Sequence, residues 1–230
     1  MRRIQNLMEQ WLFIGPDNRQ EQVNLPHTWN AKDGQDGGND YYRGTCHYEK
    51  TFEKPEFDPE AEEVYLEFLG VNASSDVTVN GKELAHHDGG YSTFRINITE
   101  VLEDRNKLEV TVDNSVNGKV YPQKADFTFY GGIYRDVRFL IVSKEHFDLD
   151  YLGSNGIKIT PEVKENEANV HIETFTNTEE AQVNVQIKDQ DGKVVAEGNG
   201  CDVNLNIQNP IRWHGRKNPY LYTAVATLTV

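Results

Sequence analysis

Apolar and polar residues alternate one by one along much of this 230-residue chain. The segments 63–69, 76–80 and 107–113 show the pattern most clearly. Successive side chains of a β-strand point to opposite faces, so this alternation indicates strands that are buried on one face. No segment carries a sustained apolar stripe at helical spacing, and only residues 98–102 are expected to form a short helical turn, with Thr99 as its N-cap. The sequence therefore predicts an all-β fold built from sandwiches.

The character of the chain changes near residue 145, which predicts two domains, residues 1–145 and 146–230. Before this point the loops are long and rich in glycine, aspartate and aromatic residues. After it the predicted strands are short and regular, and they cover residues 156–163, 168–176, 181–189, 193–198, 202–208 and 220–230. A seven-stranded immunoglobulin-like sandwich needs one strand more. Because the last segment is still apolar at Val230, we expect that the final strand is missing and that the natural protein continues.

Two pairs of neighbouring residues predict specific backbone features. Asn80-Gly81 follows an alternating segment and is typical of the tight turn of a β-hairpin. Gly131-Gly132 precedes a strongly apolar strand candidate. Paired glycines allow a positive φ angle or a close approach to another surface.

Composition excludes several classes of protein. There is no run of about 18 apolar residues, so no membrane-spanning helix is predicted. The N-terminus lacks the long apolar stretch of a secretory signal, and the two cysteines lie far apart, so we expect a cytoplasmic protein without disulfides. The net charge of −14, without a cluster of Lys and Arg, argues against nucleic acid as a partner.

Motifs for catalysis are lacking. The sequence contains no nucleophile elbow, phosphate-binding loop or zinc pattern, and its many carboxylates do not single out a hydrolytic pair. Residues 86–88, His-His-Asp, resemble a metal cluster, but neighbouring side chains point in different directions. We interpret them as a polar loop.

Aromatic residues gather in and beside the long loops. Their rings could bind the apolar faces of a sugar, or they could close the ends of the sandwich. These residues are Trp29, Tyr41, Tyr42, Tyr91, Phe94, Tyr121, Phe127, Phe129 and Tyr130.

Five motifs occur in an order that resembles a known family. They are VNLPHTWN at 23–30, YRGTCHYEKTF at 42–52, HDGGYSTF at 87–94, YGGIYRDV at 130–137 and WHGRKNPYLY at 213–222. Together they resemble the N-terminal part of glycoside hydrolase family 2, the β-galactosidase and β-glucuronidase family. The resemblance implies a jelly-roll sugar-binding domain over 1–145 and a smaller immunoglobulin-like sandwich over 146–230. It also implies that the two catalytic glutamates lie in a (β/α)₈ barrel beyond Val230, so the chain alone is expected to be inactive.

The resemblance assigns roles to individual residues. An aspartate six residues before the second loop glycine contacts the sugar in β-galactosidases of the family and, in some members, a sodium ion. Asp126 holds that position relative to Gly132, and a carboxylate suits both sugar hydroxyls and a hard cation. Arg43 stands near the place of a second sugar-contacting residue, which is an asparagine in the family, and is the other predicted sugar-binding residue.

Other residues of the motifs are expected to be structural. They are His27, Trp29, Arg135 and Asp136, of which the last two are expected to tie the glycine loop to its neighbours through charge-assisted hydrogen bonds. No cofactor is expected within these residues, although the full enzyme could use sodium or magnesium.

The resulting functional prediction is the non-catalytic N-terminal region of a β-galactosidase. Its expected partners are a β-galactoside, a downstream barrel of the same chain and, in an oligomer, further copies of the protein. Two alternatives stay open: a free-standing carbohydrate-binding module, and a β-sandwich module used for assembly.

Overall fold

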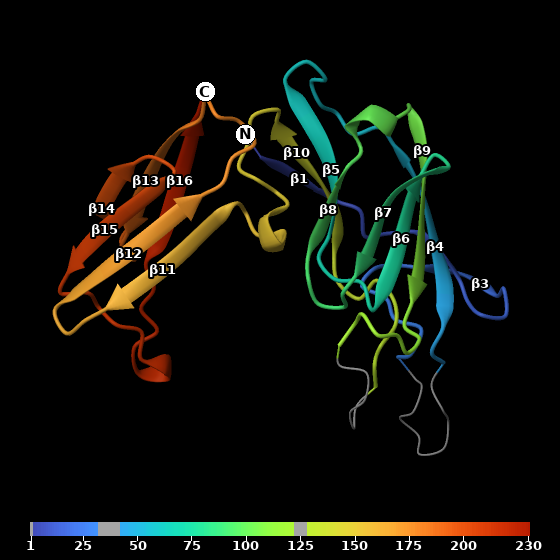
Figure 1. Cartoon of the computed structure of the whole chain (residues 1–230). Helices are drawn as coiled ribbons and strands as arrows, with labels where there is room; N and C mark the ends of the chain where they lie inside the picture. The colour runs from blue at the N-terminus through green and yellow to red at the C-terminus, as the bar shows by residue number, and fades with distance from the viewer. Residues whose placement is uncertain (1, 32–41, 122–127) are drawn as a thin grey trace. The chain divides into compact units, whose positions relative to one another are not determined.

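The computed structural model describes residues 2–31, 42–121 and 128–230 (Figure 1). The chain divides into two compact units, Met1–Lys144 and Glu145–Val230. Strands dominate both units, so the all-β prediction is confirmed. The described residues form three helical elements, all short 3₁₀ turns, and none of them has the length and apolar character needed to cross a membrane.

The first unit is a sandwich of two antiparallel sheets. The four-stranded sheet has the order β1–β10–β5–β8, and the six-stranded sheet has the order β3–β2–β4–β9–β6–β7. The bounds are β1 Arg3–Asn6, β2 Trp11–Ile14, β3 Gln20–Val23, β4 Thr45–Glu53, β5 Glu62–Phe68, β6 Ser74–Val79, β7 Lys82–Asp88, β8 Phe94–Asn97, β9 Arg105–Asp113 and β10 Val137–Ser143.

The alternating sequence pattern builds the core between these sheets. In β9 the buried residues are Asn106, Leu108, Val110 and Val112, and the residues between them face outward. The same alternation in β4 and β6 turns one face of each strand inward. Trp11, Tyr48, Phe68 and Phe139 are the largest apolar side chains that this packing buries completely or almost completely. Their burial makes the core the main source of stability of the first unit.

The predicted hairpin turn is confirmed. Asn80 and Gly81 join β6 to β7, and both have positive φ angles, 52° and 78°. A turn with two such residues matches the twist of the strands that it joins. Strand β7 is thereby placed against β6, at the edge of the six-stranded sheet.

The prediction for Thr99 as an N-cap is wrong. A 3₁₀ turn, η1, covers Thr99–Val101, but Ile98 holds the cap position and makes no capping hydrogen bond through its side chain. The Thr99 hydroxyl instead accepts a hydrogen bond from the backbone N–H of Val64 in β5, at 2.9 Å. The carboxamide of Asn97 accepts the N–H of Thr99, at 3.0 Å. Thr99 therefore links the turn to the sheet rather than beginning a helix.

One carboxylate is fully buried on the outer side of the four-stranded sheet. Glu67 of β5 faces Arg95 of β8 and Arg138 of β10 across the strands. The guanidinium group of Arg2 lies 3.5 Å from the same carboxylate. Burial by itself would raise the pKa of Glu67, but the hydrogen bonds from Arg138 and Arg95 outweigh it and lower that pKa. Glu67 is thus ionised and joins three strands of the sheet.

Ser75 provides a test of the core. Its side chain faces inward from β6, is 1% exposed, and its hydroxyl has no hydrogen-bond partner among the described residues. Because a buried hydroxyl without a partner costs free energy, we expect Ser75→Ala to raise the free energy of unfolding by about 1 kcal/mol. Urea titration followed by tryptophan fluorescence measures this, in a Trp213→Phe background that leaves Trp11 and Trp29 as reporters of the first unit.

The neighbouring serine is the matched control. The Ser74 hydroxyl donates to Asp88 at 2.7 Å, so Ser74→Ala should lower the free energy of unfolding by about 1 kcal/mol. If Ser75→Ala were as destabilising as Ser74→Ala, the Ser75 hydroxyl would have to be satisfied in solution, and the interpretation would fail.

The second unit is a smaller sandwich of six strands. One sheet has the order β11–β12–β15 and the other β14–β13–β16. The bounds are β11 Ile157–Val163, β12 Glu167–Thr174, β13 Gln182–Lys188, β14 Val194–Asn199, β15 Asp202–Gln208 and β16 Thr223–Thr229. All six predicted strands are confirmed, with shifts of at most a few residues at their ends. Alternating apolar residues of β12, β13 and β15 form the core.

Candidate functional site at the loop end of the first unit

Four segments of the first unit meet where strands β4 and β9 of the six-stranded sheet begin and end. They are residues 24–31, 42–44, 114–121 and 128–136, and we call this region the loop end. In Figure 1 it lies at the lower end of the first unit. Three of the five sequence motifs, at 23–30, 42–52 and 130–137, lie partly or wholly in it. The loop end is therefore the candidate functional site of the first unit.

Two buried side-chain amides hold the loop end together. Asn114 accepts the N–H of Gly44 at 2.9 Å, and its amide nitrogen donates to the Phe129 carbonyl at 3.0 Å. The same nitrogen donates to the side-chain oxygen of Asn30 at 3.2 Å. Asn30 is fully buried, Asn114 is 1% exposed, and we call them the amide pair.

Asn30 contacts the same two segments, 42–44 and 128–136, at other residues. Its amide nitrogen donates to the Tyr42 carbonyl at 2.8 Å, and its oxygen accepts the N–H of Gly131 at 2.8 Å. Loop backbones cannot pair their own polar groups as strands do, and unpaired buried groups are costly. The amide pair removes this cost at four places and so fixes the segments relative to one another.

The glycine pair shows both of the predicted features, a close approach and a positive φ angle. A Cβ atom on Gly131 would lie 2.1 Å from the Trp29 ring, so this residue permits a close approach. Gly132 has a φ angle of +128°, which favours glycine strongly. It also exchanges two backbone hydrogen bonds with Asn72, at 3.0 and 3.1 Å.

Arg43 lies at the loop end as part of this construction. Its Nε donates to the Asn114 carbonyl at 2.9 Å, and its guanidinium group lies 5.1 Å from the centre of the Phe129 ring. This position gives a cation–π contact and restricts the side chain. The other predicted sugar-binding residue, Asp126, lies outside the described residues. The roles of both residues in sugar binding, and of Asp126 in metal binding, stay predictions.

The loop aromatics divide into exposed rings and packed rings. Tyr42, Tyr91, Tyr121 and Tyr130 are exposed, and Tyr121 is the most open at 87%. The remaining described rings, Trp29, Phe94 and Phe129, are packed: Trp29 stacks near Phe13, Phe94 stacks between Phe68 and His87, and Phe129 is buried. Tyr41 and Phe127 lie outside the described residues.

Arg135 ties the loop to its neighbours, as expected. Its Nη1 donates to the carbonyls of Leu69 and Tyr91, at 3.3 and 3.1 Å. The contact of Asp136 with this region runs through its backbone, because its carbonyl accepts the N–H of Leu69 at 3.0 Å.

His27 also has a structural role, as expected. Its Nδ1 lies 2.8 Å from the Tyr48 hydroxyl, and burial lowers the pKa of the imidazole.

Comparisons with known proteins identify the family. Residues 38–148 match the model described as glycosyl hydrolase 2 galactose-binding domain-like, and residues 154–230 match the model of glycosyl hydrolases family 2. The chain belongs to glycosyl hydrolase family 2. The family-2 resemblance that the motifs carried is therefore confirmed.

The family-2 relatives are longer proteins. A β-glucuronidase of Bacteroides fragilis is 34% identical over 225 residues, which cover 90% of the chain and 32% of the relative. A putative β-glucuronidase of Formosa agariphila is 35% identical and matches 99% of the chain and 29% of its own length. The chain thus spans about a third of the length of these relatives.

Two solved structures have the same fold over the whole chain. An FMN-binding β-glucuronidase from Facaelibacterium prausnitzii L2-6 superposes with a TM-score of 0.91 at 38% identity, over 37% of that chain. A putative β-galactosidase from Bacteroides fragilis gives 0.91 at 30% identity, over 39% of that chain.

The structure corrects the interpretation of residues 86–88 in this family-2 chain. They do not form a polar loop but end strand β7, which pairs with β6 as far as Asp88. The pairing places His86 opposite Asp76 of the neighbouring strand β6. Among the residues that the structure describes, no group of His, Cys, Asp and Glu could hold a metal ion.

The amide pair was not predicted from the sequence. Asn30 ends the family-2 motif at 23–30, but its partner Asn114 lies 84 positions later, outside the five motifs. A local signal did exist, since asparagine at the end of a strand is typical of side chains that satisfy loop backbones. That signal does not show which loops the side chain will join.

Proposed function

We propose that this chain forms the non-catalytic N-terminal part of a family-2 retaining β-glycosidase, and that its loop end shapes the sugar site of a barrel domain in the same protein. The observation that carries the proposal is the amide pair. Two buried amides position four segments around Arg43 and several tyrosines, groups that bind sugars through hydrogen bonds and ring faces. The greater length of the relatives supports a further domain.

A β-glucuronide is the favoured substrate. The names of the relatives described above support it, and the guanidinium group of Arg43 has the charge and geometry to bind a uronate carboxylate. A β-galactoside, predicted from the sequence, is the second candidate, and the putative β-galactosidase of B. fragilis supports it. In either case we propose that Arg43 and Asp126 contact the sugar.

The test uses the full natural protein with p-nitrophenyl β-D-glucuronide and p-nitrophenyl β-D-galactoside. We expect kcat/KM to be about 100-fold or more higher for the glucuronide, because a site built for a charged group rejects an analogue that lacks it. The reverse ratio would establish the galactoside. A parent gene without a barrel-coding region, or a full protein that hydrolyses neither compound, would reject the enzyme proposal.

Arg43→Gln in the full protein tests the role of this side chain. We expect kcat/KM for the glucuronide to fall about tenfold or more, since a hydrogen bond to a charged group is lost. Arg105→Gln is the matched control because Arg105 is exposed at the start of β9, away from the loop end. An equal loss in both variants would show that Arg43 has no specific role.

A free-standing carbohydrate-binding module is favoured by one observation, the exposed tyrosines of the loop end. Calorimetry of the 230-residue chain with the two glycosides separates this alternative from the main proposal. Saturable binding by the chain alone would favour the module. We expect no binding, because the proposed site also needs the barrel.

A further inference from the structure

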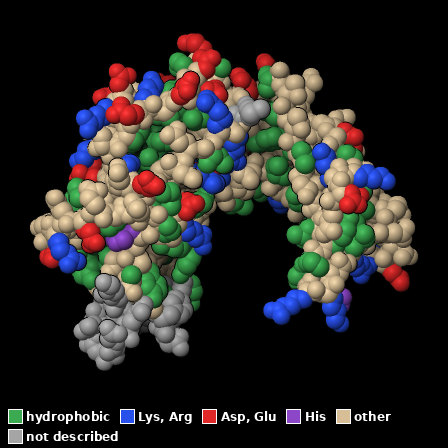
Figure 2. All heavy atoms as spheres, turned by 180° about the vertical axis from the view of Figure 1, so that it is seen from behind, with side chains coloured by type: hydrophobic (Ala, Val, Ile, Leu, Met, Phe, Trp, Pro, Cys, Tyr) green, Lys and Arg blue, Asp and Glu red, His purple; other side chains and the backbone are tan. Residues whose placement is uncertain are grey.

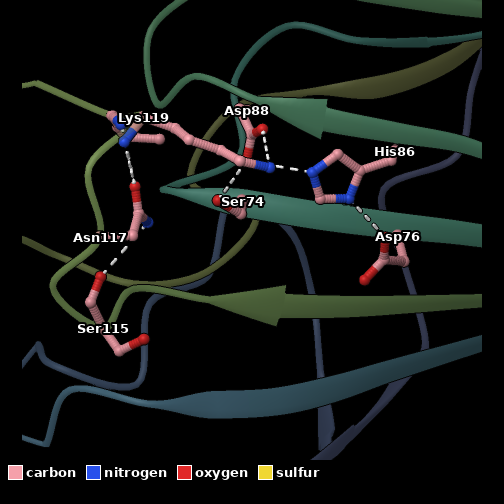
Figure 3. A network of polar contacts seen from close by, with 8 residues as sticks. Ser74, Asp76, His86, Asp88, Ser115, Asn117 and Lys119 are labelled. Carbon is pink, nitrogen blue, oxygen red and sulfur yellow. Dashed lines mark hydrogen bonds and ion pairs between the residues drawn. The ribbon is translucent and has the colours of Figure 1, made fainter.

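A polar network connects the edge strand β7 to the segment that follows β9 (Figure 3). His86 lies between two carboxylates, with Nδ1 2.6 Å from Asp76 Oδ1 and Nε2 3.1 Å from Asp88 Oδ1. Asp88 also accepts the Ser74 hydroxyl at 2.7 Å. The Lys119 ammonium group lies 2.9 Å from the other oxygen of Asp88. Two strands and one loop segment thus meet at a single carboxylate.

The Lys119 side of the network is itself ordered by a local turn. The Asn117 side-chain oxygen accepts the N–H groups of Lys119 and Val120, at 2.9 and 3.0 Å. This arrangement fixes the backbone from which the Lys119 side chain extends. The ion pair with Asp88 therefore attaches a formed turn, rather than a loose side chain, to the edge of the sheet.

The geometry around His86 favours a charged ring. A neutral imidazole has one N–H donor and one nitrogen lone pair, whereas the imidazolium has two donors. Both ring nitrogens of His86 face carboxylate oxygens, which can only accept. In the neutral ring the proton would stay on Nδ1, at the shorter contact to Asp76. The Nε2 lone pair would then face Asp88 and repel it.

We propose that His86 is the pH-sensitive part of a clamp: its imidazolium form orients Asp88 for Lys119 and so fixes residues 117–120 on the edge of the six-stranded sheet, and its neutral form releases them. This inference concerns the first unit itself and does not depend on which glycoside the full protein hydrolyses.

The charges around His86 agree with this assignment. The hydrogen bonds that the His86 ring donates to Asp76 and Asp88 raise its pKa above the ordinary value. Hydrogen bonds from Ser74 and Lys119 lower the pKa of Asp88 to about 2, so Asp88 stays ionised throughout the neutral range. His87, the other titratable neighbour, packs against Phe94 and Ser92 instead. One strand beyond β6, Thr111 lies opposite Asp76, and Asp113 of the same strand is occupied by Thr45 and Ser115.

The sign of the pH effect follows from these shifts. A group whose pKa is raised by folding contributes stability below its unfolded pKa and loses that contribution as the pH rises through the folded value. The clamp should therefore be closed in mildly acid solution and open above the raised pKa of His86. Protonation of Asp88 would disturb it only near pH 2.

The test is an NMR titration of the isotope-labelled 230-residue protein from about pH 5 to about pH 9, the range in which histidine titrates. We expect the His86 ring signals to show a midpoint above 6.5, the ordinary value. The backbone amide signals of residues 117–120 should move with the same midpoint. In Lys119→Met the His86 ring should still titrate, but the amide signals should no longer follow it.

Two histidine variants complete the test. His86→Gln should abolish the titration of amides 117–120. His47→Gln is the control and should leave it intact, because His47 faces the Thr111 hydroxyl at 3.1 Å from the same sheet, and not a pair of carboxylates. The proposal is overturned if amides 117–120 stay unmoved while His86 titrates, or if their titration survives in His86→Gln. If His86→Gln fails to fold, Lys119→Met decides the question.

Discussion

Asn114→Ala is expected to lower the free energy of unfolding of the first unit by about 3–5 kcal/mol, because several buried groups lose their partners at once. The Gly44 N–H and the Phe129 carbonyl lose contacts of 2.9 and 3.0 Å, and Asn30 loses its partner at 3.2 Å. Each unsatisfied buried group costs about 1–3 kcal/mol, and the sum is reduced where water can enter. Urea titration in the Trp213→Phe background measures the loss.

A second variant, Asn114→Asp, tests the donor of this side chain by itself. Asn114→Asp keeps the oxygen that accepts the Gly44 N–H, but it replaces the donor with an acceptor that faces two other acceptors. We expect a loss as large as that of the alanine variant at neutral pH. The loss should diminish in acid solution, because a protonated carboxyl can again donate.

A polar residue of the same loop serves as the control. Asn117→Ala removes hydrogen bonds within a partly exposed turn, at 2.9 and 3.0 Å, and should cost about 1 kcal/mol or less. If Asn114→Ala cost no more than Asn117→Ala, the amide pair would not hold the loop end together.

The elements that could be predicted from the sequence are those set by local rules. Strand β9 alternates residue by residue, and its burial follows the same alternation because the period of a strand is two. The hairpin turn at Asn80 was predicted because its backbone conformation favours only a few residue types. The family motifs located both units for the same reason, since each motif is a continuous segment.

The predictions that failed or were missing depend on partners distant in the sequence. Thr99 was expected to cap a turn, but its hydroxyl accepts the backbone N–H of Val64 in β5, 35 positions earlier. His86 was interpreted as a loop residue because glycines follow it, whereas its strand is set by pairing with β6. No local pattern reveals contacts of this kind, and the candidate site consists largely of them.

The distribution of charges could be predicted from the sequence only in part. The sequence has no cluster of Lys and Arg, and over the face of the first unit in Figure 2 basic side chains are interspersed with acidic ones. Absence of a basic run was therefore a usable guide to this surface. The grouping of three arginines around Glu67 could not be predicted in this way, because they come from distant parts of the chain. They are Arg2 near the N-terminus, Arg95 in β8 and Arg138 in β10.

Gly131→Ala should destabilise the first unit by about 2–4 kcal/mol, because the added methyl group has no room. Its Cβ atom would lie 2.1 Å from Trp29 Cζ2 and 2.7 Å from the Asn114 amide nitrogen. Both neighbours are held in place, Trp29 by its hydrogen bond to the Tyr42 carbonyl at 3.3 Å and Asn114 by the amide pair. The expected result is a lower urea midpoint, measured in the Trp213→Phe background with Trp11 and Trp29 as fluorescent reporters.

A second substitution separates steric conflict from backbone strain. Trp29→Phe removes the ring atoms that the methyl group would strike, so Gly131→Ala should cost less in that background than in the Trp29 protein. Gly132→Ala should not be rescued, because its conflicts are a φ angle of +128° and the His27 carbonyl at 2.6 Å. Gly118→Ala, which meets no atom within 4 Å, should change stability by less than about 0.5 kcal/mol. Equal losses for Gly131→Ala with and without Trp29 would contradict the close packing of Gly131 on the indole ring, and with it the proposed reason for this glycine in the loop.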